Sequence, residues 1–463
     1  MLSIDDARYV CSRREMLQIG SLGTAGLALP ALLSNPAAAG QPKHVTGKSV
    51  IFLFMQGGPS QLETFDPKPD APQSSRTVTG VIPTALPSVH FGEALPRLAR
   101  LADKLTVVRS YQTNNAGHNI QPIVGADSLD ANIGAHYARV AGATRSATGM
   151  PTNAVVFPQA VSDEVTKGSA RGDLASTGRY GKSLAPFIPG QGGQLQEDMK
   201  LAMPQERFFN DRQKVLSELD RLNRQVDASG QLSAADEIQA QAYQVLLGGG
   251  VADALDLSRE DPQVVARYDT SKFAQPGRWN HVSRGRSGYY SGQAASIGKL
   301  LLMARRLCEA GCGFVTVHAS YAGVWDMHAD GNNLNMVDGM QAVGRSFDHA
   351  VAALVEDLEA RGLTDEIMLV ASGEMGRTPK INSRGGRDHW SKIAPLLLHG
   401  GGLPGGQIIG QSTKDAGQPA TNPFGPKNLI STILHKLFDV SQLRLVSGFP
   451  PEVTRLTESE QIA

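Results

Sequence analysis

Short, uninterrupted apolar runs constrain the fold of this chain more than any other feature. The first of them, residues 49–55 (SVIFLFM), lies between Lys48 and the sequence Gly57-Gly58-Pro59. A run without polar alternation is typical of a strand that is buried on both faces, as in a parallel sheet. Similar runs recur at residues 105–108, 154–157, 314–318, 367–371 and 395–398. We therefore expect these segments to be strands of one mostly parallel sheet.

Helical patterns separate several of these predicted strands. The clearest covers residues 337–361, where Val343, Phe347 and Val351 recur three or four residues apart and Gly362 follows as a C-cap. A shorter pattern covers residues 94–103. Alternation of strands and helices predicts the α/β class, with a doubly wound, mostly parallel sheet.

The segment from about residue 194 to 311 differs in character from the rest of the chain. Helical patterns occur at residues 212–226, 234–247 and 294–309, and no strand pattern interrupts them. We interpret this segment as a mostly helical insertion into one α/β domain that spans residues 40–463.

The N-terminus resembles a twin-arginine export signal. Arg13 and Arg14 precede an apolar stretch from Ile19 to Leu33, and small residues follow up to Ala39. A membrane anchor is the alternative, but this stretch is broken by glycines and is shorter than the roughly 20 apolar residues that a span needs. We expect residues 1–39 to direct export through the twin-arginine translocase, with cleavage near Ala39. The mature protein is then expected in the periplasm or at the cell surface.

The overall charge excludes one class of partner. The 463 residues contain 44 Lys and Arg against 44 Asp and Glu, so no net positive field attracts nucleic acid. No second apolar run reaches membrane-spanning length, and we therefore predict no membrane span in the mature chain.

Polar residues that could carry chemistry follow several predicted strands, where ligands of open parallel sheets bind. The first such segment contributes a hydroxyl from Ser60 and carboxylates from Glu63 and Asp66. The alternative for Ser60 and Glu63 is a structural capping box at a helix start.

Two further segments contain residue types that bind metals. Asp326 and His328 lie two residues apart after the run 314–318, and such a pair can share one zinc, manganese or iron ion. Glu374 and Arg377 follow the run 367–371 and could hold a metal and an anionic oxygen, respectively. The alternative for this second pair is a structural ion pair that fixes the turn.

Arg387 and His389 lie in a later polar segment, and His118 follows the run 105–108. We expect His136, His318 and His349 to have packing or surface roles.

Histidines and carboxylates that converge at one sheet edge are typical of metal-dependent hydrolases. The predicted metal ligands are Asp326, His328, Glu374 and His389, with Glu63 and Asp66 as further candidates. The predicted catalytic residues are Ser60, Arg377, Arg387 and His118, and the two arginines are expected to bind an anionic oxygen of the ligand.

Long, ordered motifs then identify the chain as similar to a known family. They are residues 57–69 (GGPSQLETFDPKP), 149–152 (GMPT), 304–311 (ARRLCEAG), 325–328 (WDMH), 373–379 (GEMGRTP) and 386–390 (GRDHW). With the twin-arginine leader, they resemble the family known as domain of unknown function 1501, over nearly the whole mature chain. That family is distantly similar to the alkaline phosphatase and sulfatase superfamily.

The resemblance implies an alkaline phosphatase-like core and hydrolysis of a sulfate or phosphate ester, on a small molecule or a polysaccharide. It also implies a divalent metal: zinc, calcium, magnesium or manganese. Asp326 and His328 match an Asp/His ligand pair, Glu374 the Asp of an Asp-His dipeptide, and His389 a late metal-binding histidine. Glu63 or Asp66 would lie near the first-strand carboxylate of the superfamily.

The chain also departs from that superfamily pattern. Met375 takes the place of the histidine in the Asp-His dipeptide, and a thioether is a poor ligand for a hard divalent ion. No serine or threonine is clearly placed as a nucleophile, although Ser60, Ser110 and Thr113 are candidates. The alternative function is a binding or surface protein that keeps the fold without the catalysis. A carbohydrate-associated module is a third candidate.

Overall fold

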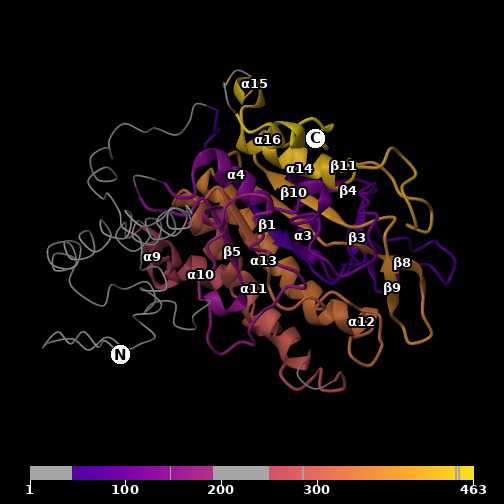
Figure 1. Cartoon of the computed structure of the whole chain (residues 1–463). Coiled ribbons are helices and arrows are strands. Elements are labelled where there is room, and N and C mark those ends of the chain that lie inside the picture. The colour runs from indigo at the N-terminus through magenta and orange to yellow at the C-terminus, as the bar shows by residue number, and fades with distance from the viewer. Residues whose placement is uncertain (1–43, 146–147, 191–249, 284–285, 444–445, 447–448) are drawn as a thin grey trace, which may run out of the picture.

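The computed structural model describes residues 44–145, 148–190, 250–283, 286–443, 446 and 449–463 (Figure 1). The predicted signal peptide and the predicted helices at 212–226 and 234–247 lie outside these residues. Among the described helices, none is both long and apolar enough to cross a membrane.

A seven-stranded sheet in the order β11-β4-β10-β7-β1-β6-β5 forms the centre of the molecule. Its strands are β1 (Ser49–Phe54), β4 (Thr106–Val108), β5 (Asn153–Val156), β6 (Phe314–Val317), β7 (Ile367–Ser372), β10 (Leu396–Gly400) and β11 (Gln407–Ile409). All pairings are parallel except those of β10, which runs antiparallel to both β4 and β7. The predicted α/β class and mostly parallel sheet are therefore confirmed, and β11 is a strand that the apolar runs did not indicate.

Strand β1 is buried along its whole length because both faces of the sheet are covered. Ile51 and Leu53 belong to the hydrophobic cluster on one face, whereas Val50 and Phe52 belong to the cluster on the other. This double burial explains why the run lacks polar alternation.

Helices cover each face of the sheet (Figure 1). The first face is covered by α3 (Pro96–Arg100), α11 (Arg286–Glu309) and α13 (Arg345–Arg361), and the second by α4 (Ile133–Ala141), α14 (Pro426–Leu437) and α16 (Pro451–Leu456). The predicted helix at 337–361 is confirmed as α12 (Met336–Gly339), a π-helical turn (Met340–Gly344) and α13, and Gly362 ends it with a φ of 69°.

The described part of the predicted insertion is helical, with α9 (Gly250–Leu255), α10 (Pro262–Tyr268) and α11. Helix α11 packs against α13, β6 and β1, so it is part of the layer that covers the sheet. A buried ion-pair network joins this layer. Arg305 on α11 contacts Glu260 at 2.6 Å and Asp357 on α13 at 3.2 Å.

Two short hairpins lie outside the central sheet: β2 (Val81–Pro83) with β3 (His90–Gly92), and β8 (Gly376–Ile381) with β9 (Arg387–Trp390). The apolar runs did not indicate either strand of the second hairpin. In the second hairpin Arg377 pairs with His389 across the strands. This register positions both residues beside the carboxyl ends of β1 and β7.

Candidate metal centre

The Asp326 carboxylate is the centre of a cluster of three imidazole rings. Asp326 lies in the irregular segment after β6 and is buried. Nε2 of His118 and Nε2 of His328 lie 2.9 and 3.0 Å from Oδ2, and Nε2 of His389 lies 3.1 Å from Oδ1. The segments that follow β4 and β6 and the hairpin after β7 therefore meet at one point, because the carboxyl ends of these strands share one edge of the sheet.

The other nitrogen of two of these rings is held by an acceptor. Nδ1 of His389 lies 2.9 Å from the carbonyl oxygen of Ala116, and Nδ1 of His118 lies 2.9 Å from Oε1 of Glu374. Since a carbonyl oxygen only accepts, Nδ1 of His389 carries the hydrogen. In the neutral ring the lone pair is then on Nε2 and faces Asp326. Metal-binding histidines are usually oriented in this way, by a carboxylate or carbonyl on the far nitrogen.

Glu374 follows β7 and is fully buried. Its two carboxylate oxygens accept hydrogen bonds from the backbone N–H of Gly57, at 2.9 and 3.1 Å. Burial raises the pKa of the Glu374 carboxyl, against the hydrogen bond from His118, which lowers it. The structure thus brings Glu374 into contact with the ring of His118 rather than with Asp326 directly.

Glycine at position 57 is required by this arrangement. Gly57 has a φ of +115°, and a Cβ there would lie 2.7 Å from the backbone nitrogen of Trp325 and 2.8 Å from that of Asp326. The backbone after β1 can therefore approach the Asp326 segment only without a side chain.

Arg377 fixes the position of the central carboxylate. Its fully buried guanidinium donates to Oδ1 of Asp326 at 2.7 Å and to the carbonyl oxygen of Gly58 at 2.7 Å, and it also contacts the carbonyl of Gly57. All of these partners are protein groups. Arg377 is therefore tied into the scaffold of the site.

The charges of the cluster act on one another strongly. Burial alone raises the pKa of the Asp326 carboxyl, but hydrogen bonds from His118, His328 and His389 and the charge of Arg377 outweigh burial and hold that pKa well below its usual range. Burial lowers the pKa of His118, but its bonds to Asp326 and Glu374 prevail and raise it to about 9. Asp326 is therefore an anion, and it attracts a proton or another cation to the same place.

Solvent reaches the cluster at two of its rings. The side chains of His328 and His389 are 24% and 26% exposed, compared with 7% for Asp326 and 8% for His118. An ion could therefore enter past these rings to the buried carboxylate.

One set of ligand atoms in the described residues meets the geometry of a metal centre. His118, Asp326 and His389 each supply one nitrogen or carboxylate oxygen, and these three atoms lie within 4.8 Å of one another. Two imidazoles and a carboxylate suit zinc and other borderline divalent ions, and catalytic zinc sites commonly use three protein ligands.

Ser60, Glu63 and Arg387 form a separate buried group. Nη2 of Arg387 pairs with Oε1 of Glu63 at 2.9 Å, with both side chains fully buried, and the Ser60 hydroxyl donates to the same carboxylate. Arg387 is linked to the cluster around Asp326 through its backbone carbonyl, which accepts a hydrogen bond from Arg377 at 3.1 Å. Ser60 and Glu63 therefore bond to each other through their side chains, and not to each other's backbone N–H groups as a capping box would require.

Asp66 has different neighbours. Its carboxylate lies 2.9 Å from Nζ of Lys68 and 3.2 Å from Nε of Arg109, and it also accepts from the Ser412 hydroxyl. These contacts neutralise Asp66 locally. The structure does not bring it into the cluster around Asp326.

Asn333 was not predicted as a site residue, yet its amide lies 3.1 Å from Nε2 of His328 and 3.4 Å from Oδ2 of Asp326. An asparagine in a polar loop is too common to single out.

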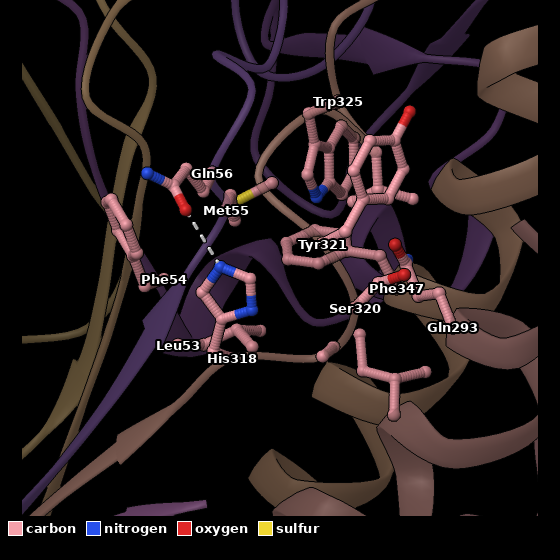
Figure 2. Close-up of a pocket in the computed structure, with 13 residues that line it drawn as sticks. Leu53, Phe54, Met55, Gln56, Gln293, His318, Ser320, Tyr321, Trp325 and Phe347 are labelled. Carbon is pink, nitrogen blue, oxygen red and sulfur yellow. Dashed lines mark hydrogen bonds between the residues drawn. The ribbon is translucent and has the colours of Figure 1, made fainter. Parts of the chain in front are cut away.

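A small pocket lies beside the Asp326 segment, lined in part by Gln56, His318, Tyr321 and Trp325. Figure 2 shows the side chains of Gln56 and His318 pointing toward one another, and Nε2 of His318 lies 3.0 Å from Oε1 of Gln56. Gln56 also bonds to the backbone of Asn119 and Arg171, at 2.8 and 3.0 Å. Burial lowers the pKa of His318 to about 4. His318 is therefore a neutral core residue that braces the loops around the site.

No curated protein matches the sequence. Similar solved structures include a sulfatase from Pseudoalteromonas sp., with 11% identity and a TM-score of 0.35, over 92% of this chain and 72% of that one. They also include an alkaline phosphatase from the Antarctic bacterium TAB5, with 13% identity and a TM-score of 0.28, over 90% and 100%. A phosphonate monoester hydrolase of Agrobacterium radiobacter has 11% identity and a TM-score of 0.28, over 84% and 73%.

The family comparison is more extensive and agrees with the motifs. The model described as "Protein of unknown function (DUF1501)" matches residues 47–462, which include every residue of the cluster around Asp326. The chain belongs to the DUF1501 family.

Proposed function

We propose that this protein is a metal-dependent hydrolase of sulfate or phosphate esters, with one divalent cation held by His118, Asp326 and His389. The observation that carries the proposal is the pair of acceptors, Glu374 and the Ala116 carbonyl, on the far nitrogens of His118 and His389. They orient two Nε2 atoms toward one carboxylate, where a divalent cation would displace the protons that these nitrogens donate to Asp326.

Each residue has a defined task under this proposal. Asp326 supplies the negative charge, Arg377 keeps that carboxylate in place, and Glu374 holds the tautomer of His118. His328 lies at the solvent side of the cluster, where it can exchange a proton with a substrate. A divalent ion, when bound, supplies Lewis-acid polarisation of an ester oxygen and activation of water.

Water is favoured over Ser60 as the nucleophile. The Ser60 hydroxyl is 1% exposed and donates to Glu63, which is itself paired with Arg387. Arg377 and Arg387 are also fully buried and engaged by protein groups, so a positioning role replaces the predicted binding of an anionic oxygen.

The proposal is tested on the purified full chain by metal analysis, followed by turnover of an aryl phosphate and an aryl sulfate with zinc or manganese. We expect about one ion per chain and hydrolysis of at least one ester. The variant Asp326→Asn should lose both. The exposed neighbour Asp388→Asn is the matched control and should retain both. Folded wild-type protein that binds no divalent ion would refute the proposal.

A second candidate function is cation binding without catalysis. Met375 is fully buried in the place where the related superfamily has a histidine, and Ser60 is committed to Glu63. Stoichiometric metal binding without turnover of either ester class would favour this candidate.

We also propose that residues 1–39 direct export through the twin-arginine translocase. Replacement of Arg13 and Arg14 by lysine should retain the full-length protein in the cytoplasm, as fractionation of the producing cells would measure. Unchanged export of that variant would contradict the assignment.

A further inference from the structure

A second pocket, with no residue of the candidate metal centre in its lining, has a volume of about 780 Å³. Its walls come from residues 126–130, helix α4, residues 179–184 and helix α16. This volume is within the range of about 300–1,000 Å³ that is usual for small-molecule sites.

Three arginines line this pocket: Arg139, Arg179 and Arg455. All three are exposed, and their guanidinium groups make no ion pair or hydrogen bond with any other residue that the structure describes. These three positive charges outnumber the two carboxylates that line the same pocket, Asp130 and Glu452, so the lining favours an anionic ligand. Guanidinium groups bind the oxygens of carboxylate, sulfate and phosphate groups in pairs.

The remaining polar groups of the pocket provide acceptors and a fixed wall. Asp130 and Glu452 also line it, and neither makes an ion pair with these arginines. Free carboxylates accept hydrogen bonds from hydroxyl groups. Tyr180 is held by Nδ1 of His136 at 2.8 Å, and Nε2 of that buried histidine donates to the Ser128 carbonyl at 2.9 Å. This side of the pocket is therefore formed before any ligand binds.

We propose that this pocket binds a hydroxylated small molecule that carries an oxyanion group. The arginines hold the oxyanion, while Asp130 and Glu452 accept from hydroxyl groups. This inference does not depend on the proposed hydrolase function.

The test is calorimetric titration of the full chain with glucose 6-phosphate, glucose 6-sulfate and glucuronate, and with glucose as the uncharged control. We expect saturable binding of at least one charged sugar and none of glucose. The charged sugar that binds identifies the oxyanion class. Asp326→Asn should bind that sugar with unchanged affinity, which separates this pocket from the metal centre.

The triple variant Arg139→Gln, Arg179→Gln, Arg455→Gln should bind at least tenfold more weakly. A charge-matched triple, Arg100→Gln, Arg345→Gln, Lys414→Gln, should bind like the wild type. The single variants Arg139→Gln and Arg179→Gln, with circular dichroism to confirm folding, should each show part of the loss. Equal affinity in the two triples, or no saturable binding of any charged sugar to the wild type, would overturn the inference.

Discussion

Nδ1 of His118 lies 2.9 Å from Oε1 of Glu374, while Nε2 of the same ring lies 2.9 Å from Asp326. A single imidazole thus joins two carboxylates that lie after different strands of the sheet. Glu374 in turn is held by the backbone N–H of Gly57, after a third strand. The orientation of the His118 ring, a ligand in the proposed metal centre, is therefore set by contacts from three strand ends.

This relationship predicts the effect of Glu374→Gln. Oε1 of Glu374 lies 2.9 Å from both Gly57 N and His118 Nδ1, and Oε2 lies 3.1 Å from the same Gly57 N. In glutamine an NH2 group replaces one of these oxygens and meets an N–H donor, and the negative charge that holds His118 is lost. Replacing an outer partner of a metal ligand typically costs about 10–100-fold in metal affinity. We expect a loss in that range for zinc, measured by calorimetry with a competing chelator. Asp388→Asn should show no loss, and an unchanged affinity for Glu374→Gln would remove Glu374 from the metal site.

Arg377→Lys should destabilise the fold. A lysine cannot reproduce the planar set of bonds to Asp326 and to the carbonyls of Gly57 and Gly58. The lysine keeps the positive charge but leaves buried carbonyl acceptors unpaired, which costs about 1–3 kcal/mol. Urea denaturation should show a decrease of that order in the free energy of unfolding. The exposed Arg384→Lys serves as control, and a similar midpoint for both variants would contradict the anchoring role.

Arg387 and Glu63 should behave as a coupled pair. Arg387→Met leaves the Glu63 carboxylate buried and unpaired, so it should lower the free energy of unfolding by about 3–5 kcal/mol. Adding Glu63→Gln removes the uncompensated charge and should restore part of that loss. The double-mutant cycle should therefore give a coupling energy above about 1 kcal/mol. Additive effects would show that the two side chains do not interact.

Glu260 should contribute to stability in a pH-dependent way. Burial raises its pKa, but contacts with Arg305, Arg306 and Arg361 outweigh burial and lower the pKa to about 2, from an ordinary value of 4.5. Its stabilising contribution is therefore complete above about pH 4.5 and is lost as the pH falls toward 2. The difference in unfolding free energy between wild type and Glu260→Gln should shrink over that interval. A difference that stays constant between pH 6 and pH 2.5 would contradict this assignment.

The apolar runs predicted the central strands because burial on both faces leaves a local record in the sequence. Strand β1 is the clearest case, since every one of its residues is buried. Strand β11 was missed because Gln407 is exposed and Ile408 and Ile409 are only partly buried, so this edge strand carries no continuous apolar pattern.

The cluster around Asp326 was predictable only in part. Asp326, His328 and His389 stand in motifs rich in charged and aromatic residues, and the structure brings these three together. The bridge that His118 forms between Asp326 and Glu374 was not predictable, because it depends on tertiary contacts. Asp326 lies 208 residues and Glu374 lies 256 residues after His118 in the chain. Asp66 looked equivalent to Glu63 from its place in the same segment. Which carboxylate meets which cation depends on the path of the backbone after β1, and periodicity carries no information about that path.

The register of the β8–β9 hairpin sets Arg377 opposite His389. Arg377 donates a hydrogen bond to the carbonyl of Gly58, which follows β1. The ring of His389 faces Asp326 at the centre of the cluster. A ligand that moves His389 would therefore also act on Arg377, its partner across the hairpin, which holds Asp326 and the backbone after β1. Ligand binding at the cluster and the position of this strand end would thus be coupled through one cross-strand pair.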